Sequence, residues 1–181
     1  GGFFTLVDRQ GNVLKSGKSD RIIKEAYGNA FAIYGLSAYA RVSEDTTALS
    51  MAKKAFLWLA RHSYDPDFGG YFQFMEEDGT PIKAGFNGVP PKDQNSSIHL
   101  LEAFTELYRV WPDPVVKDRL LMMLSLIRDR ITHPKGYLQL YLNHDMSPVS
   151  YRDSAEELRK KNWTRDHISF GHDVETAFLM L

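Results

Sequence analysis

Two copies of one motif set the architecture of this chain, and the second copy reads Gly69-Gly-Tyr-Phe-Gln-Phe-Met-Glu-Glu-Asp-Gly-Thr-Pro-Ile-Lys83. The first copy lies 68 residues earlier and reads Gly1-Gly-Phe-Phe-Thr-Leu-Val-Asp-Arg-Gln-Gly-Asn-Val-Leu-Lys15. Each copy places a glycine-containing turn between two short apolar runs, which predicts a β-hairpin. A weaker third copy runs from Gly136 to Val149. The same offset of 68 carries Leu36–Val42 onto Phe104–Val110, so we interpret the copies as repeated structural units.

After its hairpin, the first unit predicts an apolar helix followed by an amphipathic one. We expect the apolar helix over Ser19–Val42, with Ser19 or Asp20 as its N-cap. Its centre, Ala30–Leu36, is apolar nearly all round, so this helix should be buried on most sides. We expect the amphipathic helix over Asp45–His62, where a single apolar stripe indicates one buried face.

The second unit repeats this contrast between two helices. We expect the more buried helix over Ser96–Val110. The pair Asp113-Pro114 predicts the start of an amphipathic helix that ends near Ile131, because proline suits the first helical position. A third buried helix is expected to begin near Gly171. Alternating buried and half-exposed helices predict an all-α fold with two concentric layers.

Two long segments, Tyr64–Gln94 and Asn143–Phe170, are rich in proline, glycine and charge, and we expect them to be functional loops on one rim. Residues 1–181 are expected to form a single-domain fragment of about two and a half helix-pair repeats. Neither end carries a polar capping repeat, and the apolar ends suggest a homodimer formed through them. A closed ring of six such units would need about 400 residues.

The composition excludes several classes of partner. The chain has 22 basic and 23 acidic residues, a net charge of -1, and no run of apolar residues long enough to span a membrane. We therefore expect neither nucleic acid nor a membrane as a partner. The absence of cysteine fits a cytoplasmic protein and excludes thiolate chemistry.

Polar residues recur near the starts of the three buried helices, where a core helix would not need them. Tyr27 and Asn95 are equivalent under the repeat, and His99 lies four residues after Asn95 on the same helix face. His172 and Glu175 are three residues apart at the start of the last helix. This recurrence predicts that the five side chains converge on one site, at the opening of the ring where the inner helices begin.

Each of these residues also has a structural interpretation. His99 can be a core histidine bonded to a carbonyl, and Asn95 can cap its helix. Tyr27 can serve packing, and His172 with Glu175 can form a capping arrangement. A metal site built from His99, His172 and Glu175 has no tight ligand motif behind it, so we expect neither metal nor cofactor.

Three motifs resemble the N-acylglucosamine 2-epimerase superfamily, and most closely its cellobiose 2-epimerase branch. They are Tyr27-Gly-Asn-Ala-Phe-Ala-Ile-Tyr-Gly-Leu-Ser-Ala-Tyr39, Asn95-Ser-Ser-Ile-His-Leu-Leu-Glu-Ala-Phe104 and Phe170-Gly-His-Asp-Val-Glu175. The resemblance covers essentially the whole chain and implies a partial (α/α)6 barrel, a toroid of helix-hairpin repeats of which this chain is about half.

The resemblance also implies roles for the five residues. His172 matches one of two acid/base histidines, and Glu175 matches the carboxylate that accompanies it. His99, Asn95 and Tyr27 match residues that contact the reducing-end sugar and its enediol. The second histidine and a substrate-binding arginine are expected outside these 181 residues. A departure is Gly28-Asn29, where the family commonly has Asn-Gln after the tyrosine.

These implications predict an isomerase that epimerises C2 of an oligosaccharide or hexose, with histidine removing and returning the proton through an enediol. The isolated fragment is expected to be inactive. One alternative is a glycoside hydrolase on the same barrel, which needs paired carboxylates, with Asp65, Asp67 and Asp173 as candidates. The other is a non-catalytic fragment.

Overall fold

The computed structural model describes residues 1–16 and 19–181. Its helices are α1 (Ala26–Ser43), α2 (Thr46–His62), α3 (Gln94–Val110), α4 (Pro114–Leu126), α5 (Glu156–Lys161) and α6 (Phe170–Leu179), with a π-helical turn at Ile127–Ile131 and a 3-10 turn at Trp163–Arg165. Its strands are β1 (Ile23–Glu25), β2 (Phe74–Glu76), β3 (Lys92–Asp93) and β4 (Tyr141–Leu142).

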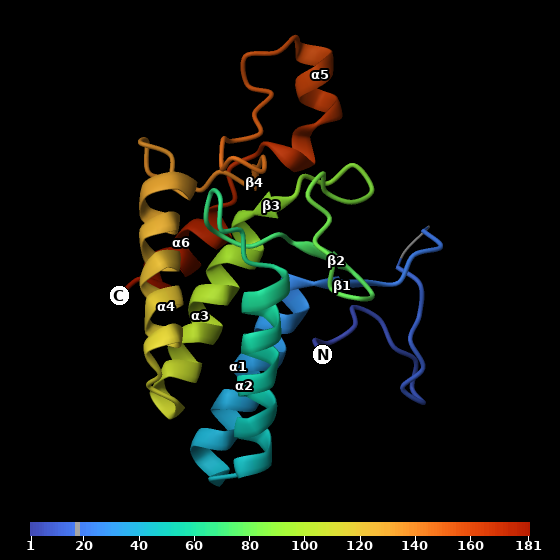
Figure 1. Ribbon diagram of the computed structural model, residues 1–181. Helices are drawn as coiled ribbons and strands as arrows, with labels where there is room; N and C mark the ends of the chain where they lie inside the picture. The colour runs from blue at the N-terminus through green and yellow to red at the C-terminus, as the bar shows by residue number, and fades with distance from the viewer. Residues whose placement is uncertain (17–18) are drawn as a thin grey trace.

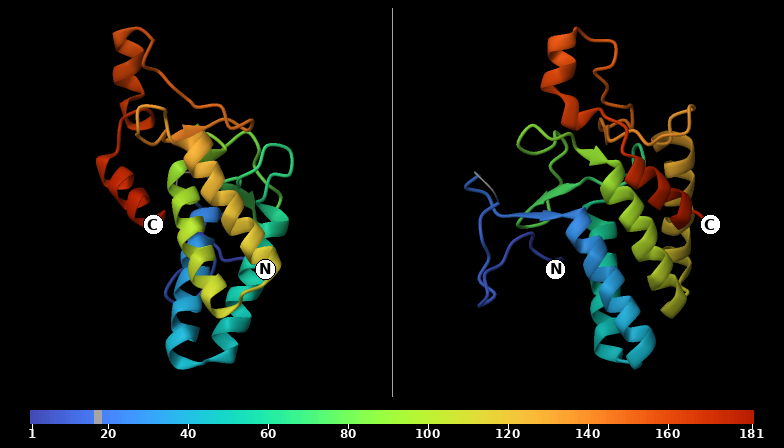
Figure 2. Two further views of the ribbon diagram at one scale, coloured as in Figure 1. Left: turned by 90° about the vertical axis from the view of Figure 1, so that its left-hand side faces the viewer. Right: turned by 180° about the vertical axis from the view of Figure 1, so that it is seen from behind.

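The long helices form two layers, as predicted (Figure 1). Seen from behind, α1, α3 and α6 stand in front, with α2 and α4 behind them (Figure 2). Helix α1 packs on α2 and α3, and α3 packs on α4 and α6. The N-terminal ends of α1, α3 and α6 all lie at the end of the molecule that carries the strands and α5 (Figure 2).

The three inner helices that were expected to be buried, α1, α3 and α6, differ in how much of their surface is covered. Helix α3 is covered on nearly all sides, because it lies between α1, α4 and α6. Helix α1 is buried on one face only, and Phe31, Tyr39 and Val42 are exposed. The prediction of buried inner helices is therefore correct for α3 and wrong for α1 and α6, because Thr176 is the single buried residue of α6.

The outer helices α2 and α4 begin where the sequence predicted, directly after a capping aspartate, whereas α1 begins later than predicted. Asp45 accepts hydrogen bonds from the amides of Thr47 and Ala48 at the start of α2, and Asp113 accepts one from Val115 beside Pro114. The expected start of α1 at Ser19 is wrong. Residues Ile23–Glu25 instead pair with β2 as an antiparallel strand, which satisfies their backbone groups outside a helix.

Three hairpins close with equivalent hydrogen bonds, which confirms the weak third copy. The amide of Asp8 donates to the carbonyl of Asn12 at 2.9 Å, and the same bond joins Glu76 to Thr80 at 2.9 Å and Asn143 to Ser147 at 2.8 Å. The left-handed position in each turn is held by Gly11, Gly79 and Met146. Methionine at a position that favours glycine made the third copy hard to see in the sequence.

Each hairpin also joins its unit to the preceding one. Strand β1 pairs with β2 and β3 pairs with β4, so the strand that leads into an inner helix always binds the next hairpin. The first amides of α1 and α3 repeat this link, because Ala26 donates to Gln73 at 2.8 Å and Gln94 donates to Leu140 at 3.0 Å.

A buried lysine in each entry strand reinforces this junction. The Nζ of Lys24 donates to the carbonyls of Gly1 and Glu77, and Nζ of Lys92 donates to the equivalent carbonyls of Gly69 and His144. Lys92 also binds the Asp65 carboxylate at 2.5 Å, and both side chains of this pair are essentially inaccessible to solvent.

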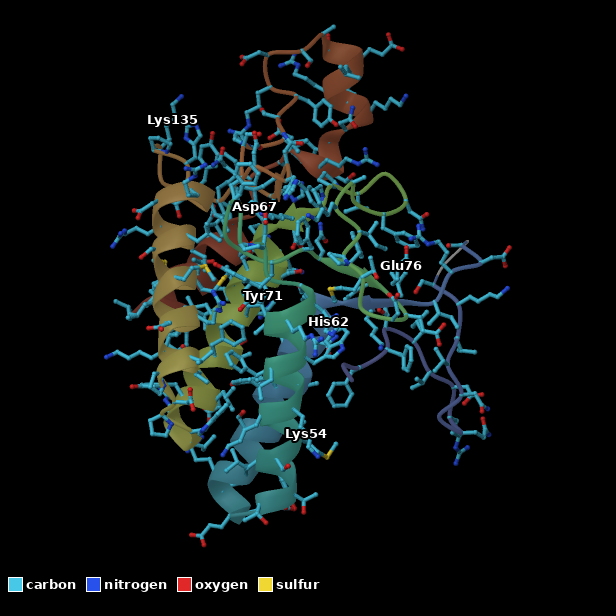
Figure 3. All side chains as sticks on the ribbon, viewed as in Figure 1. Lys54, His62, Asp67, Tyr71, Glu76 and Lys135 are labelled. Atoms are coloured by element: carbon cyan, nitrogen blue, oxygen red, sulfur yellow. The ribbon has the colours of Figure 1, made fainter. Side chains whose placement is uncertain are left out.

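Of the two segments expected as long loops, the second holds more structure than predicted. Residues 156–165 form α5 and the 3-10 turn, which project above the layers (Figure 1). Side chains of Tyr71 and its neighbours fill the space between the helices, whereas Lys54 and Lys135 point outward (Figure 3). No helix in the described ranges has the length and apolar character needed to cross a bilayer.

Candidate active site

The first group of predicted site residues lies between α1 and α3. The ring of His99 packs against Tyr27 and Phe31, with centroid distances of 5.3 and 4.6 Å. His99 is only 8% exposed, while Tyr27 remains 38% exposed. The structure therefore brings Tyr27 and His99 together, and it adds Phe31, which the sequence did not single out.

The polar partner of His99 is a carboxylate on its own helix. Nδ1 of His99 lies 3.1 Å from Oε2 of Glu102, one turn further along α3. The alternative of a core histidine bonded to a carbonyl is not what the structure shows. A carboxylate at Nδ1 orients the ring and leaves Nε2 for another partner.

The second group lies between α3 and α6. Nδ1 of His172 is 3.0 Å from Nε2 of Gln94 and 2.9 Å from Oγ of Ser169. Ser169 precedes α6 but makes no capping bond to the helix backbone, because its hydroxyl faces the imidazole instead. Gln94 was missed in the sequence, where a glutamine at a helix start carries no signal of its own.

Asn95 and Glu175 are half-buried and keep their predicted places near the starts of α3 and α6. Asn95 does not cap α3, because Asp93 is the N-cap and accepts from the amide of Ser96 at 3.2 Å. Within the described residues no hydrogen bond joins Glu175 to His172, so the assignment of Glu175 as the partner of His172 stays a prediction.

Two further carboxyls, Glu25 and Asp93, occupy equivalent positions just before α1 and α3. Burial raises the pKa of Asp93 to about 6, against the effect of its bonds from Ser96. Burial also raises the pKa of Glu25. The Asp93 carboxyl can thus carry a proton in mildly acidic solution, and it interacts with His99 and Glu25.

The departure at Gly28-Asn29 has a structural reason. Oδ1 of Asn29 accepts from the amide of Phe3 at 2.8 Å, and its Nδ2 donates to the carbonyls of Phe3 and Glu25. Asn29 is completely buried, so it fastens the first hairpin to α1 and does not face a substrate.

The two groups of site residues lie on different sides of α3 but at the same end of the molecule. His99 faces α1, and Gln94 reaches His172 on α6. Two cavities of the described chain lie elsewhere. One of about 630 Å³ is on the α5 segment, lined by Tyr151, Arg152, Trp163 and neighbours, and one of about 310 Å³ is beside the second hairpin.

A separate cluster has the composition of a metal site. Ligand atoms of Asp65, Asp67 and His144 lie within 4.8 Å of one another (Asp67 is labelled in Figure 3). The ammonium of Lys92 already neutralises Asp65 and holds the pKa of that carboxyl below its ordinary value, although burial alone would raise it. A cation there would meet the positive charge of Lys92, which disfavours binding.

Comparison with known proteins decides the family. A sequence profile described as N-acylglucosamine 2-epimerase (GlcNAc 2-epimerase) matches residues 1–181. The chain belongs to this family. The cellobiose 2-epimerase of Ruminococcus albus is 30% identical over 185 residues, which cover 99% of this chain and 42% of that protein. The cellobiose 2-epimerase of Bacteroides fragilis is 29% identical over 164 residues, which cover 87% of this chain and 38% of that protein.

Solved structures of the N-acylglucosamine 2-epimerase family agree with the fold. The cellobiose 2-epimerase of Spirochaeta thermophila superposes with a TM-score of 0.81 at 33% identity, over 99% of this chain and 40% of that chain. The prediction of a partial (α/α)6 barrel is confirmed. The chain spans about two fifths of the length of these relatives.

Proposed function

We propose that this chain supplies one part of the active site of a sugar 2-epimerase that acts on the reducing end of an oligosaccharide or hexose. The observation that carries the proposal is the family match over all 181 residues. The site agrees with it, because the contacts of His172 within the described residues all use Nδ1, which leaves Nε2 for a substrate.

In the proposed reaction the sugar ring opens and the carbon next to the aldehyde loses its proton. Nε2 of His172 takes the proton from C2, and the electron pair moves to the carbonyl oxygen to give an enediolate. A proton then returns to the other face of C2, from a second acid or from the same group after the intermediate turns. We propose that Asn95 and His99 hydrogen-bond the developing oxyanion and that Tyr27 packs against the sugar.

The hydrolase alternative is weaker because two of its three candidate carboxylates, those of Asp65 and Asp173, are already engaged. Asp65 is ion-paired with Lys92. Asp173 accepts from the amide of Leu138 at 2.9 Å and so fixes the third hairpin to α6. A glycosidase needs two free carboxyl groups on either side of the glycosidic bond, and these two groups are about 5 to 10 Å apart.

The length of the relatives bears on the activity of the isolated chain. A chain of 181 residues lines one side of a ring whose other inner helices lie outside it. We propose that the second acid/base histidine and the substrate arginine come from that remainder. On this proposal the isolated chain has no measurable epimerase activity.

The test is hydrogen exchange at C2 in deuterated water, with the protein at the full length of its relatives. Cellobiose, N-acetylglucosamine and mannose serve as parallel substrates. The wild type should label one of these sugars at C2 without cleaving it, and His172→Ala should lower the exchange rate by at least about 1000-fold, a loss typical of an essential proton-transfer group.

His62→Gln is the matched control. His62 lies at the end of α2 against the second hairpin, where it stacks on Trp58 at 4.9 Å (Figure 3). Its replacement should leave exchange intact. Full exchange in His172→Ala would remove His172 from the mechanism, and cleavage of the sugar without labelling would point to a hydrolase.

A further inference from the structure

The side-chain amide of Gln94 is buried, and only one of its two polar atoms has a partner among the described residues. Gln94 is 2% exposed, and its amide end touches the Nδ1 atom of His172 at 3.0 Å. Its Oε1 atom is buried and has no hydrogen-bond partner among the described residues. A buried amide oxygen without a donor costs about 1–3 kcal/mol, so its position calls for an explanation.

The chemistry of the imidazole supplies a constraint. If Nε2 of His172 takes a proton from carbon, the neutral ring must carry its own proton on Nδ1 beforehand. After the transfer the imidazolium carries protons on both nitrogens, and returning the proton from Nε2 restores the first state. Nδ1 therefore keeps its proton throughout, and the atom that faces it has to be an acceptor.

The two ends of a glutamine amide have nearly the same shape and differ in what they bind. With the NH2 group toward Nδ1, the imidazole proton is forced onto Nε2, and His172 cannot act there as a base. With the amide turned by 180°, Oε1 accepts the proton of Nδ1, and the NH2 group takes the buried position that Oε1 held. Ser169 fits either state, because a hydroxyl both donates and accepts.

We propose that Gln94 is a positioning residue that fixes His172 as the Nδ1–H tautomer through its Oε1 atom and so leaves Nε2 as the base. This rests on the proposed function of His172. A neutral amide has a second consequence. It orients the ring without the charge of a carboxylate, which would stabilise the imidazolium and hold the proton that the reaction has to give back. His99 differs in this respect, because its Nδ1 atom faces the carboxylate of Glu102 and not an amide.

The first test reads the tautomer itself and needs no activity. Full-length protein carrying 15N-histidine is studied by long-range 1H–15N correlation, with His172 assigned from the signal lost in His172→Gln. The proposal expects a protonated Nδ1 and an unprotonated Nε2 in the wild type, and a shift toward the Nε2–H form in Gln94→Met. A wild-type His172 with its proton on Nε2 would overturn it.

The second test uses kinetics of C2 exchange. Gln94→Met keeps the side-chain length and removes the acceptor, so kcat should fall about 10- to 100-fold with KM nearly unchanged. Gln94→Glu keeps an acceptor and should retain more activity than Gln94→Met, but the acidic limb of its kcat/KM profile should move about one pH unit upward, because the carboxylate stabilises the imidazolium.

Gln73→Met is the matched control for the loss of a buried amide. Gln73 is also nearly inaccessible, and its Nε2 donates to the carbonyl of Pro90 at 2.6 Å, away from His172. An equal fall of kcat in Gln73→Met and Gln94→Met, or an unmoved profile in Gln94→Glu, would reduce Gln94 to a packing residue. The tautomer measurement stays valid even if no sugar is epimerised, so failure of this inference is distinguishable from failure of the proposed function.

Discussion

Asp93 combines two roles in a single side chain. It caps α3 by accepting from the amide of Ser96, and it is buried near His99 and Glu25. Burial raises the pKa of its carboxyl to about 6 from an ordinary value of 3.8. The folded protein therefore binds this proton more tightly than the unfolded chain does.

The sign of the resulting pH effect follows from this difference in proton binding. Between pH 4 and pH 6 the folded state holds a proton on Asp93 that the unfolded state has lost, so stability falls as pH rises through this window. A difference of about two pKa units corresponds to about 3 kcal/mol. We expect the free energy of unfolding of Asp93→Asn to lack this decline, since asparagine also caps a helix well. Denaturant titrations at pH 4, 5, 6 and 7 measure it, and parallel curves for the two proteins would contradict the prediction.

At the level of residues, the sequence identified those that share one helix and missed those that meet across helices. Asn95 and His99 were placed on one face of α3 by their spacing alone. Gln94 and Phe31 were missed, because their importance arises from contact with His172 and His99 on or beside neighbouring helices. Sequence spacing carries no information about such contacts.

At the level of elements, local signals succeeded where no other segment competed for the backbone. The helix starts at Asp45 and Asp113 were predicted correctly, because in each case the N-cap satisfies amides within its own helix. Ser19 was chosen wrongly as a cap because the pairing of Ile23–Glu25 with a hairpin about 50 residues later is not local. The helix α5 was missed because it is short, and none of its residues is buried.

The junction between units gives a second stability prediction. Lys92→Met leaves the buried carboxylate of Asp65 without a counter-charge, and breaking such a pair costs about 3–5 kcal/mol. Lys24→Met should cost less, because Lys24 binds two carbonyls and aromatic rings but no carboxylate in the described chain. Urea denaturation of both variants measures the difference.

A double variant isolates the charge effect. Adding Asp65→Asn to Lys92→Met removes the stranded charge and should recover part of the loss. Equal costs for Lys24→Met and Lys92→Met, or no recovery in the double variant, would show that the two lysines act only through their bonds to carbonyls.

At the level of the whole molecule, exposed apolar side chains lie on α1 and α6, the two inner helices at the edges of the layer. Phe170, Val174 and Phe178 of α6 are 77%, 72% and 76% exposed, and they form one stripe because they are four residues apart. On the other edge, Phe31, Tyr39 and Val42 are exposed on α1. In a chain as long as the relatives, further helices of the ring would cover such surfaces.

The isolated 181-residue chain has no such cover, so we expect it to dimerise through α6. Light scattering should give a mass near twice 20.7 kDa, and Val174→Asp with Phe178→Glu should return the chain to a monomer. The matched control is Leu158→Glu on α5, another exposed apolar residue outside the stripe. A wild-type monomer at micromolar concentration would contradict the prediction.

The two strand pairs, β1–β2 and β3–β4, lie at one end of the two layers, and this placement has a mechanical consequence (Figure 1). In the described residues, the strand pairs that tie neighbouring units together lie where the inner helices begin, whereas the opposite ends of α1 and α3 are joined by the ion pair of Arg41 with Glu106. The molecule should therefore be stiff at the N-terminal ends of the inner helices and less constrained at their opposite ends. On heating, the ends of the helices far from the strands should separate first. Amide hydrogen exchange should become slower along each inner helix toward its N-terminal end, where His99 and His172 lie.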